Sequence, residues 1–424
     1  MTHHTPVGGA ERLDSVDLVR GYALLGVLLM NVHLWLRNPP QPYWLDPHPW
    51  PGALNHATDV LLRFWFETKS VTLFSALFAL GLCIQRERAL EKGLHWGVYA
   101  GRRMGSMLLF GLLHIVLIWN GDILSWYAVC SLTILPFLGR KEATLRRWIL
   151  GVAGLQVVSI LVFGVFKMFG PPPTAQALLA SPGGRAEEIR AWGQACVQGY
   201  QQTSWIAVMR FRLADYVKIY MSPLAVAIVS FIFLNFLVGT WIWKEGSLRA
   251  PREHAGRIGR FALVLLAIGG FLGIFLTFPE AILAFIRQHW RWARVGLPLL
   301  GLAQSLGAQP LGFGIGAGLV WLNLRPRWSV LLRPLTYVGR MAFTNYIVQS
   351  LVCTFVFYGW GLGLYNRVGP AAGMAFSFAL FGLQVPFSRW WLSRFRFGPL
   401  EWLWRCLTYG ELQPFRLGGP AGPA

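Results

Sequence analysis

One histidine, His114, lies inside an otherwise apolar stretch of the chain, and Asp122 follows just beyond the end of that stretch. Histidine is the side chain whose ordinary pKa suits proton transfer near neutral pH, and a carboxylate can orient an imidazole for that task. A lone histidine in an apolar helix is also commonly a hydrogen-bonded core residue, so a structural role stays open. We predict a catalytic pair in which His114 is the base and Asp122 orients it.

A second group of polar residues lies near the start of the chain. Asp17 and Arg20 are three residues apart, a spacing that lets them pair on one face of a helix, and Asn31 lies three turns further along the same side. A guanidinium at the mouth of a bundle is suited to a phosphate-bearing ligand. The alternative is that these residues only orient the first helix in a membrane.

Other ionisable and amide side chains lie where lipid is expected, and such residues are the first functional candidates in a membrane protein. Asp59, Arg63 and Glu67 form a stripe at four-residue spacing, followed by Lys69. Hydrogen bonding between helices is the structural alternative for all of them. The residues predicted to bind substrate or acyl-CoA are Asp17, Arg20, Asn31, Lys69, Arg102, Arg103, Arg340, Asn345 and Gln349.

The elements that position these residues are membrane-spanning helices. Of the 424 residues, 55% are hydrophobic and only 13% are charged, and the mean hydropathy is +0.47, whereas a soluble domain carries about 25% charged residues. A span of hydrocarbon needs about 20 apolar residues. The apolar stretches are 16–36, 59–84, 104–120, 122–138, 148–168, 217–243, 261–278, 295–324, 335–359 and 370–392. The sequence therefore predicts an all-α, polytopic membrane bundle of about ten helices, within a range of nine to eleven.

The net charge of +20 is explained by membrane orientation and not by nucleic-acid binding, because the basic residues fall between apolar stretches and not along one face. They gather in alternate loops, as in 86–103, 140–147 and 244–260. We predict that both ends of the chain are cytoplasmic and that the protein lies in the bacterial inner membrane, with the lipid bilayer as its partner. The 287–294 segment opposes the rule, since its arginines would lie outside.

The sequence also predicts the local structure of three further segments. Pro310 could kink or split the 295–324 stretch, the polar 169–216 segment could form a helical cap on the outer face, and Gly398-Pro399 reads as the start of an interfacial helix. Residues 413–424 are expected to be a disordered tail. The five cysteines form no CxxC pair, and we found no metal-site, Walker A or GxSxG motif, so we predict no metal and no bound cofactor.

Several motifs together resemble the YeiB-like family (domain-of-unknown-function family 418). They are LDSVDLVRGYALLGVLLMN, FETKSVTLFSALFALG, the 102–128 run, GRMAFTNYIVQS and RFRFGPLEWLWRCLTYG. That family is grouped with the membrane acyltransferases, which include acyltransferase-3 proteins and heparan-alpha-glucosaminide acetyltransferase. Asp17, Arg20 and Gly21 match the first-helix pattern of that superfamily. Relatives often carry histidine eleven residues after the arginine, where this chain has Asn31.

The resemblance implies a six-helix N-terminal part over 1–245, similar to the heparan-alpha-glucosaminide acetyltransferase core, and a four-helix YeiB-like domain over 246–412. It also implies transfer of an acyl group from cytoplasmic acyl-CoA, as co-substrate, to a small-molecule acceptor in the periplasm or envelope. Two alternatives remain: a transporter of a small polar or anionic solute, and a membrane protein with no small-molecule site.

Overall fold

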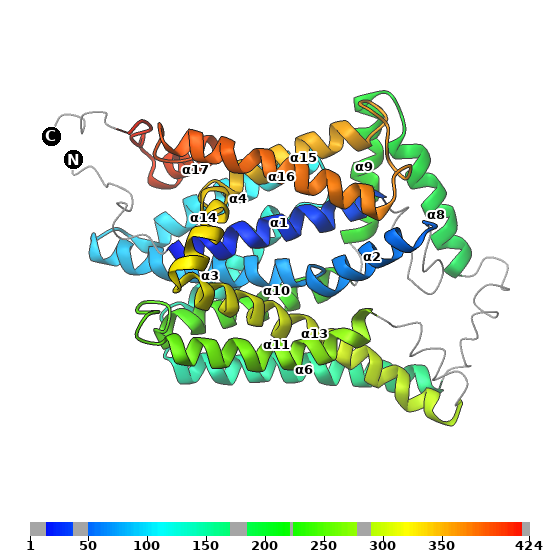
Figure 1. The fold of residues 1–424 in the computed structure, drawn as a ribbon, viewed down its shortest axis with the longest axis horizontal. Helices are drawn as coiled ribbons and strands as arrows, with labels where there is room; N and C mark the ends of the chain where they lie inside the picture. The colour runs from blue at the N-terminus through cyan, green and yellow to red at the C-terminus, as the bar shows by residue number, and fades with distance from the viewer. Residues whose placement is uncertain (1–13, 37–49, 170–184, 221–223, 278–289, 418–424) are drawn as a thin grey trace.

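Each of the ten apolar stretches coincides with a helix or a pair of helices in the computed structural model (Figure 1). The structure describes residues 14–36, 50–169, 185–220, 224–277 and 290–417. In the first half of the chain the helices are α1 (Asp14–Leu36), α2 (Ala53–Trp65), α3 (Lys69–Glu91), α4 (Trp96–Leu117), α5 (Leu124–Ile134), η2 (Leu135–Phe137), α6 (Glu142–Phe169), α8 (Arg185–Tyr200) and α9 (Trp205–Tyr220). In the second half they are α10 (Leu224–Glu245), α11 (Ala255–Thr277), α13 (Trp290–Asn323), α14 (Pro326–Arg340), α15 (Ala342–Phe357), α16 (Pro370–Leu392) and α17 (Pro399–Tyr409).

The predicted fold class, a helical membrane bundle, is confirmed. Within the described ranges, seven helices are long and apolar enough to cross a membrane, and the two shorter apolar helices Leu124–Phe137 and Ala342–Phe357 accompany them. Large apolar side chains cover the outside of these helices, as lipid requires. The number of spans and their orientation stay predictions.

Two of the predicted spans are broken. The 59–84 stretch bends between α2 and α3, where Thr68 has a left-handed backbone with φ of 63°. The 335–359 stretch breaks at Met341, because the Glu401 carboxylate accepts hydrogen bonds from the backbone N–H groups of Phe343 and Thr344 and thereby caps a new helix. The 295–324 stretch, by contrast, is a single helix that contains Pro310.

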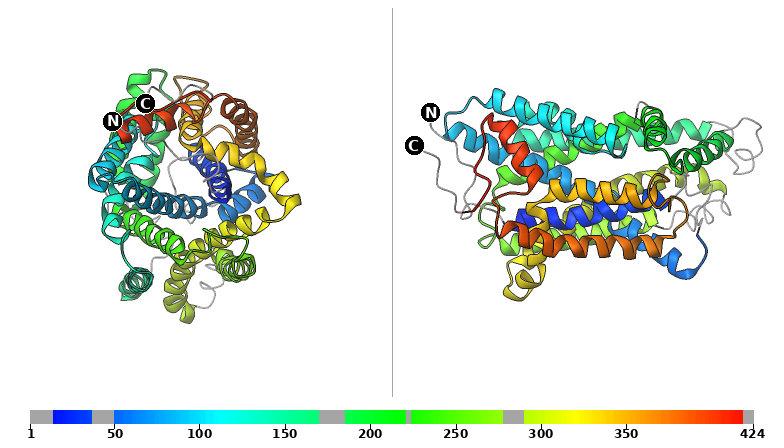
Figure 2. Two further views of the ribbon diagram at one scale, coloured as in Figure 1. Left: turned by 90° about the vertical axis from the view of Figure 1, so that its left-hand side faces the viewer. Right: turned by 90° about the horizontal axis from the view of Figure 1, so that it is seen from above.

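The helices run side by side between two ends that differ in character (Figure 1). The first turn of α1 and the helix α17 lie at one end, which we call the arginine end, and α14 crosses the bundle there. The helices α8 and α9 lie at the opposite end, which we call the cap end. Figure 2 shows α1 near the centre of the surrounding helices, where it packs against α14, α3 and α16.

Two glycines allow the closest of these packings. A Cβ atom on Gly21 of α1 would collide with the carbonyl of Leu335, and one on Gly339 of α14 would collide with the carbonyl of Asp17. Small residues at such crossings are the usual means by which membrane helices approach each other. The crossing places Arg20 and Arg340, the neighbours of the two glycines, at the same end of the bundle.

The cap end is held by buried polar groups of α9. Arg212 donates hydrogen bonds to the backbone carbonyls of Val116 and Ile118, which lie at the end of α4 and have no partner within the helix. Asp215 accepts hydrogen bonds from Asn120, at 3.0 Å, and from Tyr200, at 2.6 Å. The described part of the polar 169–216 segment is thus mostly helical, as expected, and it caps the end of α4; that this is the outer face stays a prediction.

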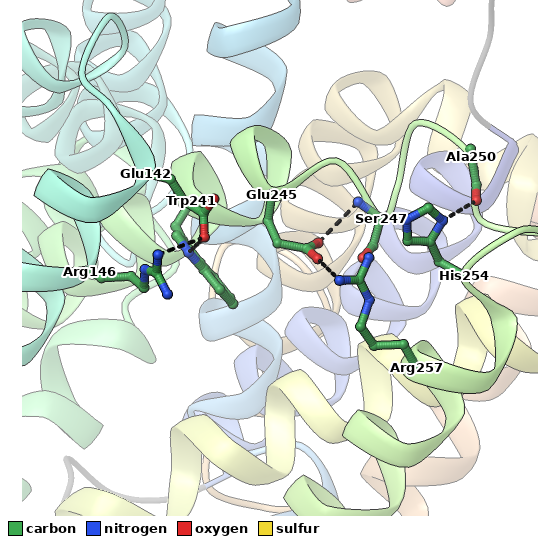
Figure 3. Close-up of polar contacts among 8 residues, drawn as sticks. All are labelled: Glu142, Arg146, Trp241, Glu245, Ser247, Ala250, His254 and Arg257. Atoms are coloured by element: carbon green, nitrogen blue, oxygen red, sulfur yellow. Dashed lines mark hydrogen bonds and ion pairs between the residues drawn. The ribbon is translucent and has the colours of Figure 1, made fainter.

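At the arginine end, the turn between α10 and α11 is fixed by its own polar contacts (Figure 3). The Glu245 carboxylate accepts a hydrogen bond from Ser247 N at 3.0 Å and pairs with Arg257 at 2.8 Å. Glu142 of α6 accepts one from the indole of Trp241 at 3.2 Å. These contacts join neighbouring helices, and none of these residues lines the cavity described below.

The segment 413–424 was expected to be disordered, and its described part is not free of the bundle. Arg396 N donates to Phe415 O at 2.9 Å, and Leu417 N donates to Arg394 O at 3.0 Å. The aromatic ring of Phe415 packs near those of Trp402 and Phe395. Residues 418–424 lie outside the described part of the chain.

Candidate functional site

A cavity of about 2280 Å³ follows α1 and α3 along most of their length. Its lining on α1 includes Asp17, Arg20, Leu24, Val27, Asn31 and Leu34, and its lining on α3 includes Ser70, Phe74, Phe78, Gly81, Gln85 and Arg88. Both sets repeat every three to four residues, so each is one face of its helix. At 1.5 Å per residue, the α1 stripe covers roughly 25 Å, close to the thickness of the hydrocarbon core.

Polarity changes along this cavity in the same order on both helices. On α1, Asp17 and Arg20 stand at the arginine end, Leu24 and Val27 occupy the middle, and Asn31 lies towards the cap end. On α3, charged and amide residues again lie at the arginine end and apolar residues fill the middle. The cavity therefore has two polar ends joined by an apolar section.

The arginine end of the cavity holds an excess of positive charge. Arg20 pairs with Asp17 at 2.5 Å, and the Arg103 guanidinium stacks 3.7 Å from the centre of the Trp404 ring. Several guanidinium groups line this end, and we call four of them, Arg20, Arg103, Arg340 and Arg405, the arginine cluster. Arginine is the side chain best suited to bind phosphate, since its planar fork matches two oxygens at once.

The acids near the arginine cluster leave much of that charge unbalanced. Both oxygens of Glu401 receive hydrogen bonds from the start of α15, through Thr344 and Phe343. Burial raises the pKa of Glu401. Burial also lowers the pKa of Arg405, and the nearby charge of Arg20 acts in the same direction. An anion bound here would relieve the repulsion between the arginines.

Two arginines of the cluster also have a hydrogen-bond donor without an acceptor. The Nε atoms of Arg103 and Arg340 are buried and have no hydrogen-bond partner among the described residues. Buried hydrogen-bond donors almost always have an acceptor in proteins. Two donors without an acceptor at one end of a cavity therefore indicate the position of a ligand or an ordered water. The cluster can therefore hold an anion with several oxygens.

The predicted pair His114–Asp122 lies towards the cap end. His114 Nδ1 is 3.1 Å from Asp122 Oδ1, and both side chains are fully buried. The other carboxylate oxygen accepts a hydrogen bond from Ser125 N at 2.6 Å, which fixes the carboxylate at the start of α5. The Nε2 atom of His114 has no hydrogen-bond partner in the described ranges. The structure thus brings the two residues together and leaves one imidazole nitrogen available.

His114 does not itself line the cavity, whereas its neighbours do. Asp122, Trp119 and Tyr346 all lie on the cavity wall. The Tyr346 ring is centred 5.2 Å from the imidazole, and the Trp119 ring 6.4 Å from it at a steep angle. His114 is therefore one side chain removed from the cavity and does not face lipid.

Lys69 was expected to line the channel, but it is not among the residues that line this cavity. Its Nζ donates a hydrogen bond to the carbonyl of Arg63 at 2.9 Å, and the side chain is buried away from the cavity. Asp59 pairs with Arg63 at 2.7 Å and with His33 at 3.1 Å. Asp59, Arg63 and His33 therefore form an internal ionic cluster, whereas Glu67 of the stripe lines the cavity.

Asn345 and Gln349 were expected to form a cavity wall, and the structure instead places them between helices. Gln349 donates to the side chain of Gln384 at 2.8 Å, and Asn345 donates to Ser388 at 3.0 Å. These bonds join α15 to α16. Arg102 also lies off the cavity, where it donates to the Tyr409 carbonyl at 3.3 Å and ties α4 to α17. Asp17, Arg20, Asn31, Arg103, Arg340 and Asp122 do line the cavity.

Two cavity residues escaped the sequence analysis. Arg405 and Trp404 of α17 line the arginine end, although this segment was predicted only as an interfacial helix. The available signal was the four-residue spacing of Glu401 and Arg405, which places both on one face of a short amphipathic helix. No group of three or more metal-ligating side chains occurs in the part of the chain that the structure describes.

The helices and the cavity define a multi-pass membrane protein of the helical-bundle class. The chain belongs to the YeiB-like DUF418 family. The model described as "Protein of unknown function (DUF418)" matches residues 242–411. "Uncharacterized protein YxaH" of Bacillus subtilis (strain 168) is 31% identical over 95% of this chain and 96% of its own length. "Uncharacterized protein YeiB" of Escherichia coli (strain K12) is 29% identical over 97% of this chain and 98% of its own length. No solved structure matches.

Proposed function

We propose that the protein is an inner-membrane acyltransferase that moves an acyl group from acyl-CoA at the arginine end to an acceptor hydroxyl at the cap end. The observation that carries this proposal is the single cavity that joins the arginine cluster to Asp122. In this proposal the arginine end faces the cytoplasm, in agreement with the positive-inside rule. The phosphates of coenzyme A would lie among the arginines, as the charge excess there favours.

The residues that line the two ends of the cavity then have defined tasks. Arg20, Arg103, Arg340 and Arg405 hold the phosphates, and the indole of Trp404 offers a flat surface beside them for the adenine. Along α4, Arg103 and His114 are eleven residues apart, so they are separated by about 16 Å. The extended pantetheine arm of coenzyme A can cover such a distance and carry the thioester towards Asp122.

The reaction balances without any further reagent. His114 takes the proton of the acceptor hydroxyl, whose oxygen attacks the thioester carbonyl carbon, and a new C–O bond forms. The C–S bond breaks, and the leaving thiolate of coenzyme A receives the proton from His114. Asp122 holds the imidazole and stabilises its charged form between these steps. Because His114 lies behind Trp119 and Tyr346, one of these rings must turn aside for the hydroxyl to reach Nε2.

The direct test uses the purified full-length protein in proteoliposomes. The wild type is expected to cleave acyl-CoA, and His114→Gln is expected to abolish cleavage while it retains coenzyme A binding. Coenzyme A release without any loss in the His114→Gln variant would contradict the assigned base.

A transporter of a small anionic solute is the second candidate, because the cavity runs along nearly the whole of α1 and has a cationic end. Flux of such a solute through proteoliposomes, in the absence of acyl-CoA and unaffected by His114→Gln, would favour it.

A further inference from the structure

One part of the cavity lies beside the path that joins the arginine cluster to Asp122. Towards the cap end, the cavity extends to α6 and α10, where its wall includes Leu155, Gln156, Val226, Ser230 and Phe231. We call this part the side arm. It lies in the same half of the bundle as Asp122, because α10 begins and α6 ends at the cap end.

The side arm reaches the outer surface of the bundle. Leu155 is 65% exposed and Val226 is 73% exposed, although both line the cavity. These residues belong to helices that are long and apolar enough to cross a membrane. An opening at that position faces hydrocarbon, so what enters through it comes from the bilayer and not from water.

The chemistry of the arm suits a molecule with a tail and a polar head. Its wall is mostly apolar, and the Gln156 amide already satisfies Ser230 through a hydrogen bond of 2.9 Å. Tyr220, Trp126 and the Asp122 carboxylate line the same cavity, and the ring centres of Trp126 and Tyr220 are 5.8 Å apart. A hydrocarbon chain in the arm would therefore present its headgroup to Asp122.

We infer that the acceptor is a membrane lipid, which enters sideways between α6 and α10 and presents a headgroup hydroxyl to the His114–Asp122 pair. The inference deepens the proposed acyl transfer and rests on it for the reaction of that hydroxyl. Entry of the lipid is a separate property, and it can be measured without turnover. A long acyl chain on the donor could occupy the same arm, so the experiment must separate the two sources.

The experiment uses the full-length protein in nanodiscs with phosphatidylglycerol that carries a photoactivatable diazirine in one acyl chain. After illumination, labelled peptides are identified by mass spectrometry. Tyr127 lines the cavity but is only 3% exposed, so a lipid on the outer surface cannot label it. The inference requires labelling of Tyr127. Labels confined to outward-facing positions such as Leu150 would overturn it.

A matched pair of variants tests the route. Leu155→Trp narrows the side arm and is expected to reduce labelling of Tyr127 at least fivefold. Leu150→Trp lies on the same helix with 72% exposure and does not line the cavity, so it should leave that labelling unchanged. Equal effects of the two substitutions would contradict entry through the arm.

Competition with acyl-CoA shows whether the acyl chain in the side arm belongs to the lipid acceptor or to the donor. Coenzyme A with a palmitoyl group and coenzyme A with an acetyl group are each added before illumination. If the arm holds the lipid acceptor, neither compound displaces the Tyr127 label. Displacement by palmitoyl-CoA alone would assign the arm to the donor and overturn the inference. Because labelling needs no turnover, loss of acyl transfer activity would refute the proposed function and leave this result intact.

Discussion

Gly339 of α14 lies directly against Gly21 of α1, and each backbone occupies the space that a side chain on the other helix would need. The contact brings together two short motifs that are far apart in the sequence, Arg20-Gly21 and Gly339-Arg340. Both arginines line the arginine end of the cavity. The glycines set the distance between the helices, and the arginines beside them supply the charge.

Substitution of Gly339 by alanine should destabilise the protein. The added methyl group would meet the carbonyl of Asp17, and overpacking of this kind costs about 1–3 kcal/mol. The melting temperature in detergent should fall accordingly. Gly382→Ala is the matched control, because a Cβ atom there meets no atom within 4 Å. A Gly339→Ala variant as stable as Gly382→Ala would show that the crossing tolerates a side chain.

Removal of one member of the arginine cluster should weaken binding of coenzyme A. A hydrogen bond to a charged group contributes about 1.5–3 kcal/mol, so Arg340→Ala should raise the dissociation constant roughly 10- to 100-fold. Titration calorimetry with coenzyme A measures this. Arg327→Ala on the same helix is the control, since Arg327 is exposed and does not line the cavity. An equal loss in both variants would indicate a general charge effect.

Asp122→Asn should separate catalysis from folding. The amide oxygen can still accept the hydrogen bond from Ser125 N, so the start of α5 is retained, but the negative charge beside His114 is lost. Acyl transfer should fall by roughly 10²–10⁴-fold, the usual range for the loss of acid–base catalysis. The melting temperature and the affinity for coenzyme A should stay near the wild-type values. Full activity in this variant would remove Asp122 from the mechanism.

Gln349→Ala should change stability and leave substrate binding alone. Its side chain bonds to Gln384, whose own amide donates to the Asn345 carbonyl, so the network links α15 to α16. Hydrogen bonds between membrane helices contribute about 0.6 kcal/mol on average, up to about 1.7. A double-mutant cycle with Gln384→Ala in an unfolding titration should give a coupling of that size. A weakened affinity for coenzyme A without a stability change would restore Gln349 to the cavity wall.

The helices were predictable from the sequence because each apolar stretch is long enough to need a helix in lipid. The breaks within the helices could not be predicted. The break at Met341 depends on Glu401, which lies about sixty positions further along the chain. Periodicity also showed that Asn345 and Gln349 share a face, but it could not show which neighbour that face meets. In the structure, that face meets α16.

The candidate site was predictable in part for the same reason. His114 and Asp122 are separated by a short helical hairpin, so local geometry alone brings them close. Arg20 and Arg340 could be named as candidates because they lie within apolar stretches of the sequence. Lys69 was misplaced because burial of a cation predicts a partner without telling whether that partner is a ligand or, as here, the Arg63 carbonyl. Arg405 was missed because its role depends on where α17 folds back.

The central claim is that one cavity connects donor and acceptor ends for acyl transfer. Its most direct test follows radiolabelled acyl-CoA added to one side of proteoliposomes that contain the wild type or Asp122→Asn. The account predicts that label from the arginine-end side appears covalently in lipid with the wild type, and at least a hundredfold more slowly with Asp122→Asn. Label that stays entirely on coenzyme A in the wild type, or equal transfer in both proteins, would contradict it.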